Sequence, residues 1–473
     1  MRFFVYVSLL IALVPLFFSR PFFGLCIYYV VSLLQPKILC WRGDFQDAMI
    51  VGVPLVLGAI TVGVKRRMLL PKIDARSGQV AGAQHQVVKA KLFELAWPLA
   101  ALFFLLLYIA ANRAISPFPM NRSTEAFRAL CKVFLVTALL TGMAVDHRRF
   151  RQLYIIVALS VAFWAIKGGF KVLALGPHQV YGKTYDNNLF ALTSVMVLPM
   201  VFYHAMTVRR ARWRYALFAS SALIILAVIG SQSRAGFVAL AFVVACMAWT
   251  SRYRFRALGA VAMAAVLTLY VSKGEIKNRI DSIIAYRADE SARSRFGTWD
   301  TAMQVWSEHL LFGVGFNQYQ PAARAMFGGK REAHNIFLQN LTELGLIGHP
   351  FWLAIVLGVP LSLLRFMHHA KRLPAQYRWA YYWARGLLLG LIAFSIHGFF
   401  HNEEFLELMI TMVGLAVALQ IMTRRVLAED GLALHAEALQ AAESNVRPVR
   451  PPRRIEPGSR RPSIWSQPLP ATR

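Results

Sequence analysis

Charge is scarce in this chain, and acidic charge is scarcest. Only 16% of the 473 residues are charged and 57% are hydrophobic, whereas soluble domains average about 25% and about 45–50%. This composition excludes a soluble enzyme and a disordered protein, and it predicts a polytopic membrane protein. Only 23 acidic residues accompany 52 lysines and arginines, which gives a formal net charge of +29. On a soluble protein such an excess suggests nucleic-acid binding, but on a membrane protein it suggests basic cytoplasmic loops.

Cysteine is also scarce. The four cysteines lie in or beside apolar runs at unrelated spacings, and no CxxC pair or zinc-ligand spacing is present. The sequence therefore indicates neither a disulfide framework nor a metal site, and we expect no cofactor. The first 19 residues resemble a signal peptide, but Arg20-Pro21 stands where a cleavage site needs small residues. We interpret this run as a retained membrane segment.

Apolar runs dominate the rest of the chain. A spanning helix needs about 20 mostly apolar residues, and the first 34 residues hold either one long bent helix or two short ones broken at Arg20-Pro21. With eleven further runs they predict an all-α polytopic integral membrane protein with 12–13 transmembrane helices. The eleven runs are 48–64, 95–111, 127–145, 152–167, 189–207, 215–230, 236–250, 257–271, 346–364, 386–400 and 406–422.

The basic residues are concentrated in every second connector between these helices. Of the 52, 31 lie in alternate connectors and in the C-terminal tail, all on one side of the membrane. Because cytoplasmic loops carry the excess of lysine and arginine, this side and the C-terminus are predicted to be cytoplasmic. The net charge is then an orientation signal, and we expect no nucleic-acid partner. The basic segments are 65–91, 148–151, 209–214, 252–256, 365–385 and the tail after 423.

One connector on the opposite side is much longer than the rest. Residues 272–345 form a loop of 74 residues with nine basic and eight acidic residues. A long, nearly neutral external loop among short ones is where function is expected. We divide the chain into an N-terminal transmembrane bundle (1–271), this external loop, C-terminal transmembrane helices (346–423) and a basic, Pro- and Arg-rich cytoplasmic tail (424–473). The tail is predicted to be disordered.

Three polar segments on this external side are candidates for chemistry. The turn SQSRAG places Arg234 at the membrane boundary, where the alternative interpretation is an arginine that reaches to the interface. The segment SRFGTWD places Arg295 after a predicted N-cap at Ser294, in the first turn of a helix with an apolar face. The segment HNIFLQNLTELGLIG places His334 and Asn335 at the exposed start of a helix that runs into the next span.

These side chains suit a substrate with a pyrophosphate group. Guanidinium groups bind phosphate oxygens through paired, charge-assisted hydrogen bonds, and a histidine acts as a base near neutral pH. Lys330 and Arg331, just before the histidine, add positive potential. Arg234, Arg295 and His334 can meet because all three are predicted on one face of the membrane. The alternative for the histidine is a capping or packing role.

Together these motifs resemble a known family. SQSRAG, then RFGTWDTA and LFGVG, then HNIFLQNLTELGLIG in a long external loop, are similar to the O-antigen ligase/polymerase superfamily of Gram-negative bacteria. The N-terminal RPFFGLCIYYVVSLLQPKILCW and the run YGKTYDNNLFAL resemble its subgroup of O-glycosylation ligases found with the exosortase A system. The resemblance covers most of residues 1–425. Leu310 stands where the family usually has a proline before LFGVG.

The resemblance implies a membrane glycosyltransferase of the bacterial inner membrane, with residues 272–345 as a periplasmic catalytic loop. It would transfer a glycan from an undecaprenyl-pyrophosphate carrier to a hydroxyl of a protein or lipid acceptor, without a metal or a nucleotide sugar. The family's arginines match Arg234 and Arg295, which would hold the pyrophosphate, and Arg293 is close enough to share the second role. The family's histidine matches His334, which would deprotonate the acceptor.

Further external residues are candidates for binding the glycan or the acceptor. Asp186 lies at another membrane boundary, near the expected glycan entrance, and helix capping is an equal alternative for it. The tight acidic turn 401–404 is a candidate contact of the acceptor. The substrate-binding candidates are Lys183, Asp186, Arg293, Lys330, Arg331 and Asn335.

Two other functions are compatible with the sequence. One is a repeat-unit polymerase, which uses the same carrier, and the other is a polysaccharide or lipid transporter. A transporter is expected to bury ionisable residues at the membrane midplane. Here the spans are nearly free of charge, with Arg128 and Lys132 close to an end, while polar groups crowd the external loop. This distribution favours an enzyme whose partners are its donor, its acceptor and membrane lipids.

Overall fold

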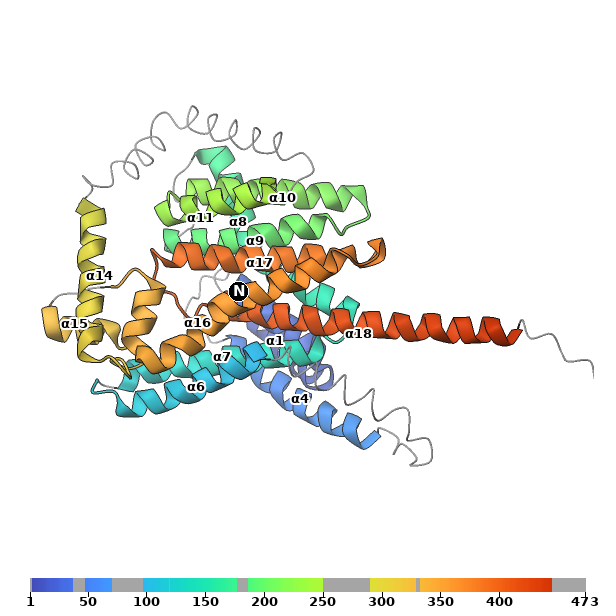
Figure 1. The fold of residues 1–473 in the computed structure, drawn as a ribbon, viewed down its shortest axis with the longest axis horizontal. Coiled ribbons are helices and arrows are strands. Elements are labelled where there is room, and N and C mark those ends of the chain that lie inside the picture. The colour runs from blue at the N-terminus through green and yellow to red at the C-terminus, as the bar shows by residue number, and fades with distance from the viewer. Residues whose placement is uncertain are drawn as a thin grey trace, which may run out of the picture. The chain divides into compact units, whose positions relative to one another are not determined.

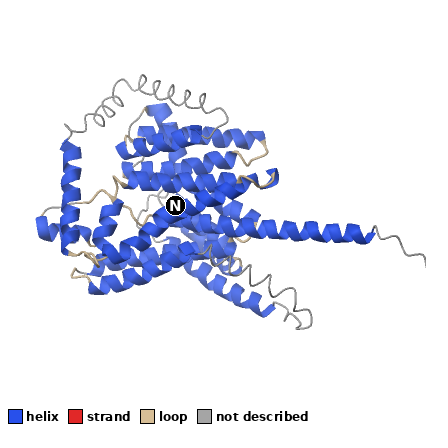
Figure 2. Cartoon of the chain, viewed as in Figure 1, coloured by secondary structure: helices blue, strands red, loops and turns tan. Residues whose placement is uncertain are grey.

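The computed structural model is built of helices and loops (Figure 1; Figure 2). It describes residues 2–36, 47–69, 97–118, 120–176, 186–249, 290–328 and 332–444, and no strand occurs among them. The helices are α1 (Arg2–Ser19), α2 (Pro21–Tyr29), the π-helix η1 (Val30–Leu34), α4 (Asp47–Leu69), α6 (Trp97–Ile115), α7 (Met120–Met143), α8 (His147–Leu175), α9 (Asn187–Ala205), α10 (Ala211–Gly230), α11 (Arg234–Trp249), α14 (Glu290–Glu308), α15 (Tyr319–Phe327), α16 (Ile336–Ala370), the 3₁₀ helix η2 (Ala375–Tyr377), α17 (Arg378–Gly398) and α18 (Glu407–Ser444).

The lengths and apolarity of these helices confirm the predicted fold class. In the described part of the chain, nine helices are long and apolar enough to cross a membrane, and three shorter apolar helices accompany them. The chain is therefore an all-α polytopic membrane protein. α1 and α2 are separate helices, because Arg20 has a non-helical backbone and Pro21 occupies the first position of α2, where its missing N–H is harmless. The predicted run 257–271 lies outside the described residues.

The chain divides into two compact units, residues 1–425 and 426–473. α18 continues as a helix to Ser444, so the segment 424–444 is helical where the sequence predicts disorder. The physical reason is its composition, since alanine, leucine and glutamate are strong helix formers. Residues 445–473 lie outside the described part.

The core of the first unit is built around α9 and α17. Buried residues occur on all sides of α9, as expected of an apolar helix inside a bundle. A Cβ on Gly390 of α17 would lie 2.5 Å from the carbonyl oxygen of Met196, and a Cβ on Gly386 would lie 3.0 Å from Cα of Met200. These glycines let the two backbones approach closely, which is how membrane helices gain tight packing. α8, α10 and α11 pack around this pair.

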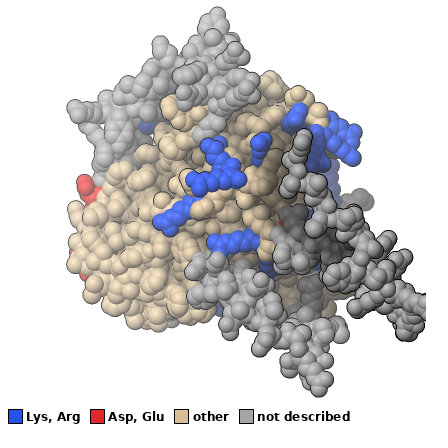
Figure 3. All heavy atoms as spheres, turned by 45° about the vertical axis from the view of Figure 1, so that its right-hand side comes forward, with Lys and Arg blue, Asp and Glu red and all other residues tan. Residues whose placement is uncertain are grey.

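One end of the bundle collects the basic connectors. Trp383 of α17 stacks on His147 at the start of α8, with 5.2 Å between ring centroids, and donates from Nε1 to Nδ1 of His204 over 3.2 Å. Figure 3 shows lysine and arginine gathered on this face. For the described residues, the predicted grouping of these connectors at one end is confirmed. The exposed basic residues there include Arg148, Arg151, Arg209, Arg210, Arg212, Arg365, Lys371, Arg372 and Arg378.

The long helix α16 is broken near the opposite end of the bundle. Gly345 has φ 65° and ψ −172°, so the helix is interrupted nine residues after its start. Residues 310–316, here called the crossing segment, run across the break and pair with the backbone on both sides of it. Buried backbone groups that a break releases need such partners, above all in a membrane protein. The four hydrogen bonds run from Val314 N to Thr342 O (2.9 Å), Gly315 N to Glu343 O (3.0 Å), Leu346 N to Leu310 O (2.9 Å) and Ile347 N to Leu311 O (3.1 Å).

A polar stripe on α6 and the residue that follows it holds the crossing segment from its other side. Tyr108, Asn112 and Ser116 recur every four residues and therefore share one helix face. Asn112 binds both ends of a tight turn, because its Nδ2 donates to the carbonyl of Phe312 (2.6 Å) and its Oδ1 accepts from the N–H of Phe316 (2.9 Å). The other two bonds run from Ser116 Oγ to Val314 O (2.8 Å) and from the Tyr108 hydroxyl to Leu344 O (2.6 Å).

This crossing explains the glycines of the LFGVG and ELGLIG motifs. Gly313 and Gly345 have φ of 71° and 65°, a region that residues with a Cβ rarely adopt. A Cβ on Gly313 would overlap the carbonyl oxygen of Glu343, and a Cβ on Gly345 would overlap that of Leu311. Both glycines are therefore required by the shape of the crossing rather than by chemistry on a substrate.

We predict that Gly345→Ala strongly destabilises the protein. Alanine would have to adopt a positive φ with an extended ψ, a region essentially confined to glycine, at about 1–3 kcal/mol. It would also overlap backbone atoms, at about 1–3 kcal/mol more. Thermal unfolding of the purified variant in detergent should start several degrees lower, or the variant should fail to accumulate.

Two glycines of the same chain serve as matched controls. Gly328 has φ 68° but open space around its Cβ position, and Gly142 has neither constraint. We expect a small loss of stability for Gly328→Ala and none for Gly142→Ala. Unfolding of Gly345→Ala at the wild-type temperature would contradict this explanation of the break.

Candidate functional site

The Arg234 turn, residues 231–236, connects α10 and α11 and is bonded to the start of α9. Ser233 Oγ donates to Oδ1 of Asn188 over 2.7 Å. Asn187 Nδ2 donates to the carbonyl oxygen of Ser231 over 3.4 Å. The hydroxyls and amides of the two segments therefore fix the turn against α9.

Arg234 is the first residue of α11 and is half-buried. An arginine in the first turn opposes the helix dipole, so helix stability does not explain its position. The backbone N–H groups of a helix start attract anions, as a guanidinium does. Gly236 lets α11 approach α9, since a Cβ there would lie 2.6 Å from Cβ of Ala191. The turn thus presents a positive group where an anion is favoured.

His334 directly precedes Asn335, the N-cap of α16, and has a strained backbone. Its φ of 49° lies in the left-handed region, and strain of this kind concentrates at functional sites. Asn335 caps the helix, because its Oδ1 accepts from the N–H groups of Phe337 (2.9 Å) and Leu338 (3.2 Å). Asn335 is buried, whereas the sequence predicts an exposed helix start. Its side-chain oxygen has a structural role, so only its amide nitrogen is left to contact a substrate.

Glu332 is a neighbour of His334 that the sequence analysis does not identify. Its Oε2 lies 3.9 Å from Nδ1 of His334, an ion-pair distance when the imidazole is protonated. Gln320 Nε2 donates to its Oε1 (2.9 Å), and Asn402 Nδ2 donates to its Oε2. The carboxylate therefore joins α15 and the 401–404 turn beside the histidine. The partners lie 12 and 70 residues away in sequence, which leaves no local signal.

Five titratable residues lie within electrostatic reach here, and we call them the acid–histidine cluster: Asp186, Glu332, His334, His401 and Glu403. Burial lowers the pKa of His401, and the charge of His334 lowers it further. The charges of Asp186 and Glu332 act in the opposite direction and raise it. Glu403 is exposed at the surface, but desolvation by the surrounding protein raises its pKa, and the charges of Glu332 and Asp186 raise it further. Desolvated groups shift in this way toward their neutral forms. In the described part of the chain, no three His, Cys, Asp or Glu are grouped to hold a metal ion.

Two further carboxyl groups, those of Glu343 and Glu404, lie close to each other near this cluster. Burial raises the pKa of Glu404 well above its usual range, and the nearby charge of Glu343 raises it further. Both oxygens of Glu404 accept from Nε2 of Gln339 over 3.2 Å. Glu343 Oε2 accepts from the N–H of Asn317 (2.6 Å), and its Oε1 accepts from that of Tyr319 (3.3 Å). The first part of α16 is thereby tied both to the 401–404 turn and to the start of α15.

The start of α9 links the Arg234 turn to the acid–histidine cluster. Asp186 caps α9, because its Oδ2 accepts from the N–H of Leu189 over 3.3 Å, which confirms the capping interpretation. The charge of Asp186 acts on the cluster, while the next two residues bind the Arg234 turn. The structure therefore brings Arg234 and His334 to the same end of the bundle, as the sequence predicts.

The other predicted site residues are placed only in part. α14 begins at Glu290, so the predicted N-cap at Ser294 is wrong, and the helix extends one turn further toward the N-terminus. α14 is held on the first part of α16, where Thr342 Oγ1 donates to the carbonyl oxygen of Ala302 over 3.3 Å. The backbones of two candidate arginines lie in the first two turns of α14. The structure does not describe the side chains of Arg293 and Arg295. It also leaves out Lys183, Lys330 and Arg331 entirely.

Fold and site together define a class of protein: a polytopic α-helical membrane protein that gathers arginine, histidine and carboxyl groups at one end, beside a broken helix. The model of the O-antigen ligase family matches residues 219–353. This segment includes the Arg234 turn, His334 and the break in α16. These residues are therefore similar to the O-antigen ligase family, which confirms the resemblance to that superfamily. Comparison with curated proteins gives no match.

We predict that the stability of the protein falls as pH rises above the ordinary carboxyl range. The folded-state pKa of Glu404 is raised, so the folded state holds this proton more tightly than the unfolded chain, whose carboxyl pKa is about 4.3. The contribution of Glu404 to the free energy of unfolding is fully present below its pKa in the unfolded chain. It is lost as pH rises through its pKa in the folded protein.

Glu404→Gln imitates the protonated side chain and should flatten this decline. Thermal unfolding in detergent, measured between about pH 5 and pH 8, should fall less for this variant than for the wild type. Glu125→Gln, at an exposed position of α7, is the control and should keep the wild-type slope. Equal slopes for Glu404→Gln and the wild type would show that Glu404 is not the group responsible.

Proposed function

We propose that this protein is a ligase that transfers a glycan from undecaprenyl pyrophosphate to an acceptor hydroxyl. The observation that carries the proposal is that the matched O-antigen ligase segment contains both Arg234 and His334, which the fold brings to one end of the bundle. We place this end on the periplasmic face of a bacterial inner membrane. The basic connectors and the C-terminus then face the cytoplasm, as the excess of positive charge requires.

The donor side of the reaction is assigned to arginine. The bond between the anomeric carbon and the pyrophosphate oxygen breaks, and the leaving pyrophosphate takes the electron pair. Arg234 from α11 and Arg295 from α14 bind its oxygens and stabilise the charge that develops, with Arg293 able to share the second position. Lys330 and Arg331 attract the anionic carrier to this end of the protein.

The acceptor side is assigned to His334. The imidazole takes the proton of the acceptor hydroxyl while that oxygen forms the new bond to the anomeric carbon. Glu332 orients the ring and stabilises the imidazolium that results, from a distance of 3.9 Å. Lys183, Asp186 and the amide nitrogen of Asn335 are proposed contacts of the glycan. The scheme uses neither a metal nor a nucleotide sugar.

A ligase and a polymerase of this reaction class differ in the acceptor that they use. A ligase uses a hydroxyl of a protein or lipid, and a polymerase uses a sugar hydroxyl of a second carrier-linked unit. Both need the same leaving group and the same base. The acidic 401–404 turn lies beside His334, where a hydroxyl-bearing acceptor would form hydrogen bonds to its carboxyl groups.

We predict that His334→Ala lowers glycan transfer by about 10²–10⁴-fold, the usual contribution of a general base. Arg234→Ala and Arg295→Ala should each lower it by about 10²–10³-fold, as expected for groups that stabilise a developing charge. The assay uses the purified protein in lipid nanodiscs with an undecaprenyl-pyrophosphate glycan, and the product is detected by mass spectrometry.

Arg324→Ala and His309→Ala are matched controls from the same external loop and should keep wild-type activity. Wild-type activity in all three site variants would contradict the site. A requirement for ATP or for a proton gradient would instead indicate a transporter.

We further predict that Glu332→Gln lowers kcat of transfer by about tenfold, the effect of losing about 1.4 kcal/mol of stabilisation, without changing KM for the donor. The amide keeps the contact with Gln320 but cannot compensate the imidazolium charge. Glu332→Asp should restore part of kcat, which a purely structural role would not explain. Glu308→Gln, at the exposed end of α14, is the control. A rise in KM with unchanged kcat would rule out this role for Glu332.

A further inference from the structure

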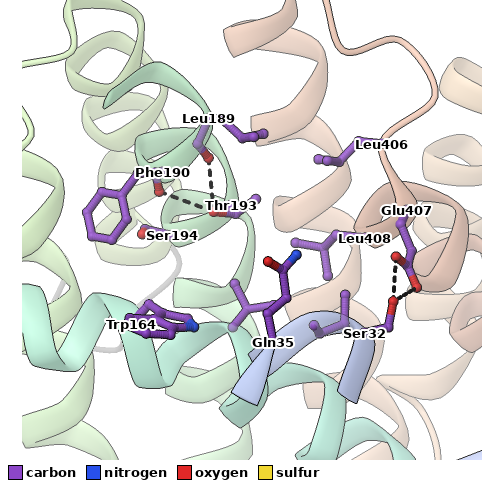
Figure 4. Close-up of a pocket in the computed structure, with 12 residues that line it drawn as sticks. Ser32, Gln35, Trp164, Leu189, Phe190, Thr193, Ser194, Leu406, Glu407 and Leu408 are labelled. Carbon is purple, nitrogen blue, oxygen red and sulfur yellow. Dashed lines mark hydrogen bonds between the residues drawn. The ribbon is translucent and has the colours of Figure 1, made fainter. Parts of the chain in front are cut away.

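A cavity of about 130 Å³ lies between η1, α8, α9 and α18 (Figure 4). Two of its lining residues are close to the candidate site. The N–H of Leu189 donates to the capping carboxylate of Asp186, and Leu406 follows Glu404 by two residues. The cavity therefore lies near the end of the bundle that holds Arg234 and His334. Its polar and aromatic lining residues are Ser32, Gln35, Trp164, Phe190, Thr193, Ser194 and Glu407.

Glu407 places a carboxyl group in a lining that is otherwise largely apolar. Both of its oxygens accept from the hydroxyl of Ser32, over 2.6 and 2.7 Å. A carboxyl group within a membrane helix is unfavourable, and such residues are retained for function. A single hydroxyl uses only part of the hydrogen-bonding capacity of two carboxylate oxygens. The carboxyl group can therefore accept further hydrogen bonds from a ligand in the cavity.

The backbone beside Glu407 is irregular in a way that shapes the cavity. Ser32 belongs to the π-helix η1, and Gln35, which ends it, has φ 51° and ψ 63°. π-helical turns and left-handed residues with a Cβ are unfavourable and occur at functional sites. Figure 4 shows the amide of Gln35 directed into the space near Thr193 and Leu408. The Trp164 indole is held in the wall, because its Nε1 donates to the carbonyl oxygen of Leu34 over 2.7 Å.

The chemistry of the lining selects among ligands. None of its described residues is basic, which disfavours the pyrophosphate group, and a carboxyl group and an amide disfavour the polyprenyl chain. One carboxyl group is too few for a calcium site, which needs about 6–8 oxygens. A sugar ring has the complementary features, since its C–H face packs on aromatic and aliphatic groups and its hydroxyls bond to a carboxylate and an amide.

The volume agrees with a single ring. An engineered cavity of about 150 Å³ holds one benzene molecule, so about 130 Å³ suits one six-membered ring whose substituents extend toward the site. We propose that this cavity binds one pyranose ring of the glycan donor, close to the pyrophosphate. Glu407 and Gln35 bind its hydroxyls and Trp164 packs on the ring. The inference rests on the proposed function, which supplies the glycan as ligand.

Binding is tested without any need for transfer. Thr193→Cys is made in a chain whose four native cysteines are replaced by alanine, and labelling by a small water-soluble methanethiosulfonate is followed in nanodiscs. The probes are undecaprenyl pyrophosphate carrying glucose, galactose or N-acetylglucosamine, and undecaprenyl pyrophosphate alone. Thr141→Cys is the matched control, since both threonines are part-buried in membrane helices and donate to the carbonyl four residues earlier.

We expect at least one sugar-bearing probe to slow labelling of Thr193→Cys about tenfold or more, as for occupancy by one bound ring, and the sugar-free carrier to leave it unchanged. Labelling of Thr141→Cys should respond to neither. Equal protection by the sugar-free carrier would assign the cavity to the lipid pyrophosphate. No protection by any of the three sugar-bearing probes would overturn the proposal.

Glu407→Gln gives an independent readout in the transfer assay. Loss of one charge-assisted hydrogen bond should raise KM for the donor about tenfold while kcat stays within about twofold. An unchanged KM would contradict the role of Glu407. Protection without transfer would refute the proposed function and keep the sugar site, whereas transfer without protection would refute the sugar site and keep the proposed function.

Discussion

The functional end of this protein depends on the break in α16. An unbroken helix of 35 residues spans about 52 Å, well beyond the hydrocarbon core of about 30 Å, so part of its length projects beyond the core. At Gly345 the backbone turns, and the crossing segment bonds to the groups on both sides. These backbone hydrogen bonds attach the crossing segment to α16, and they form in a geometry that only glycine permits at positions 313 and 345.

The nine residues before the break, 336–344, position the candidate site. Asn335 caps their start beside His334, while Gln339 binds the 401–404 turn and Glu343 binds the start of α15. Glu332 closes the arrangement by bonding α15 and the same turn beside the histidine. The motif residues thus divide into two kinds: the glycines and the cap determine shape, and arginine and histidine are the residues proposed to supply the chemistry.

Much of this arrangement could be predicted because it depends on local patterns. Apolar runs predict the spans, alternating basic connectors predict which loops meet, and both place Arg234 and His334 at one end. Glu332 could not be predicted, because its partners Gln320 and Asn402 come together only in the fold. The N-cap at Ser294 and the disorder over 424–444 are wrong because helix-forming residues extend both helices beyond the expected limits.

The central claim is that the pyrophosphate of a lipid-linked donor binds between the Arg234 turn and the acid–histidine cluster. A cryo-electron microscopy map of the protein in nanodiscs with undecaprenyl pyrophosphate tests it most directly. The account predicts density for the two phosphates within hydrogen-bond distance of the Arg234 guanidinium, on the side that faces His334. Diphosphate density at the end of the basic connectors, or away from Arg234, would contradict it.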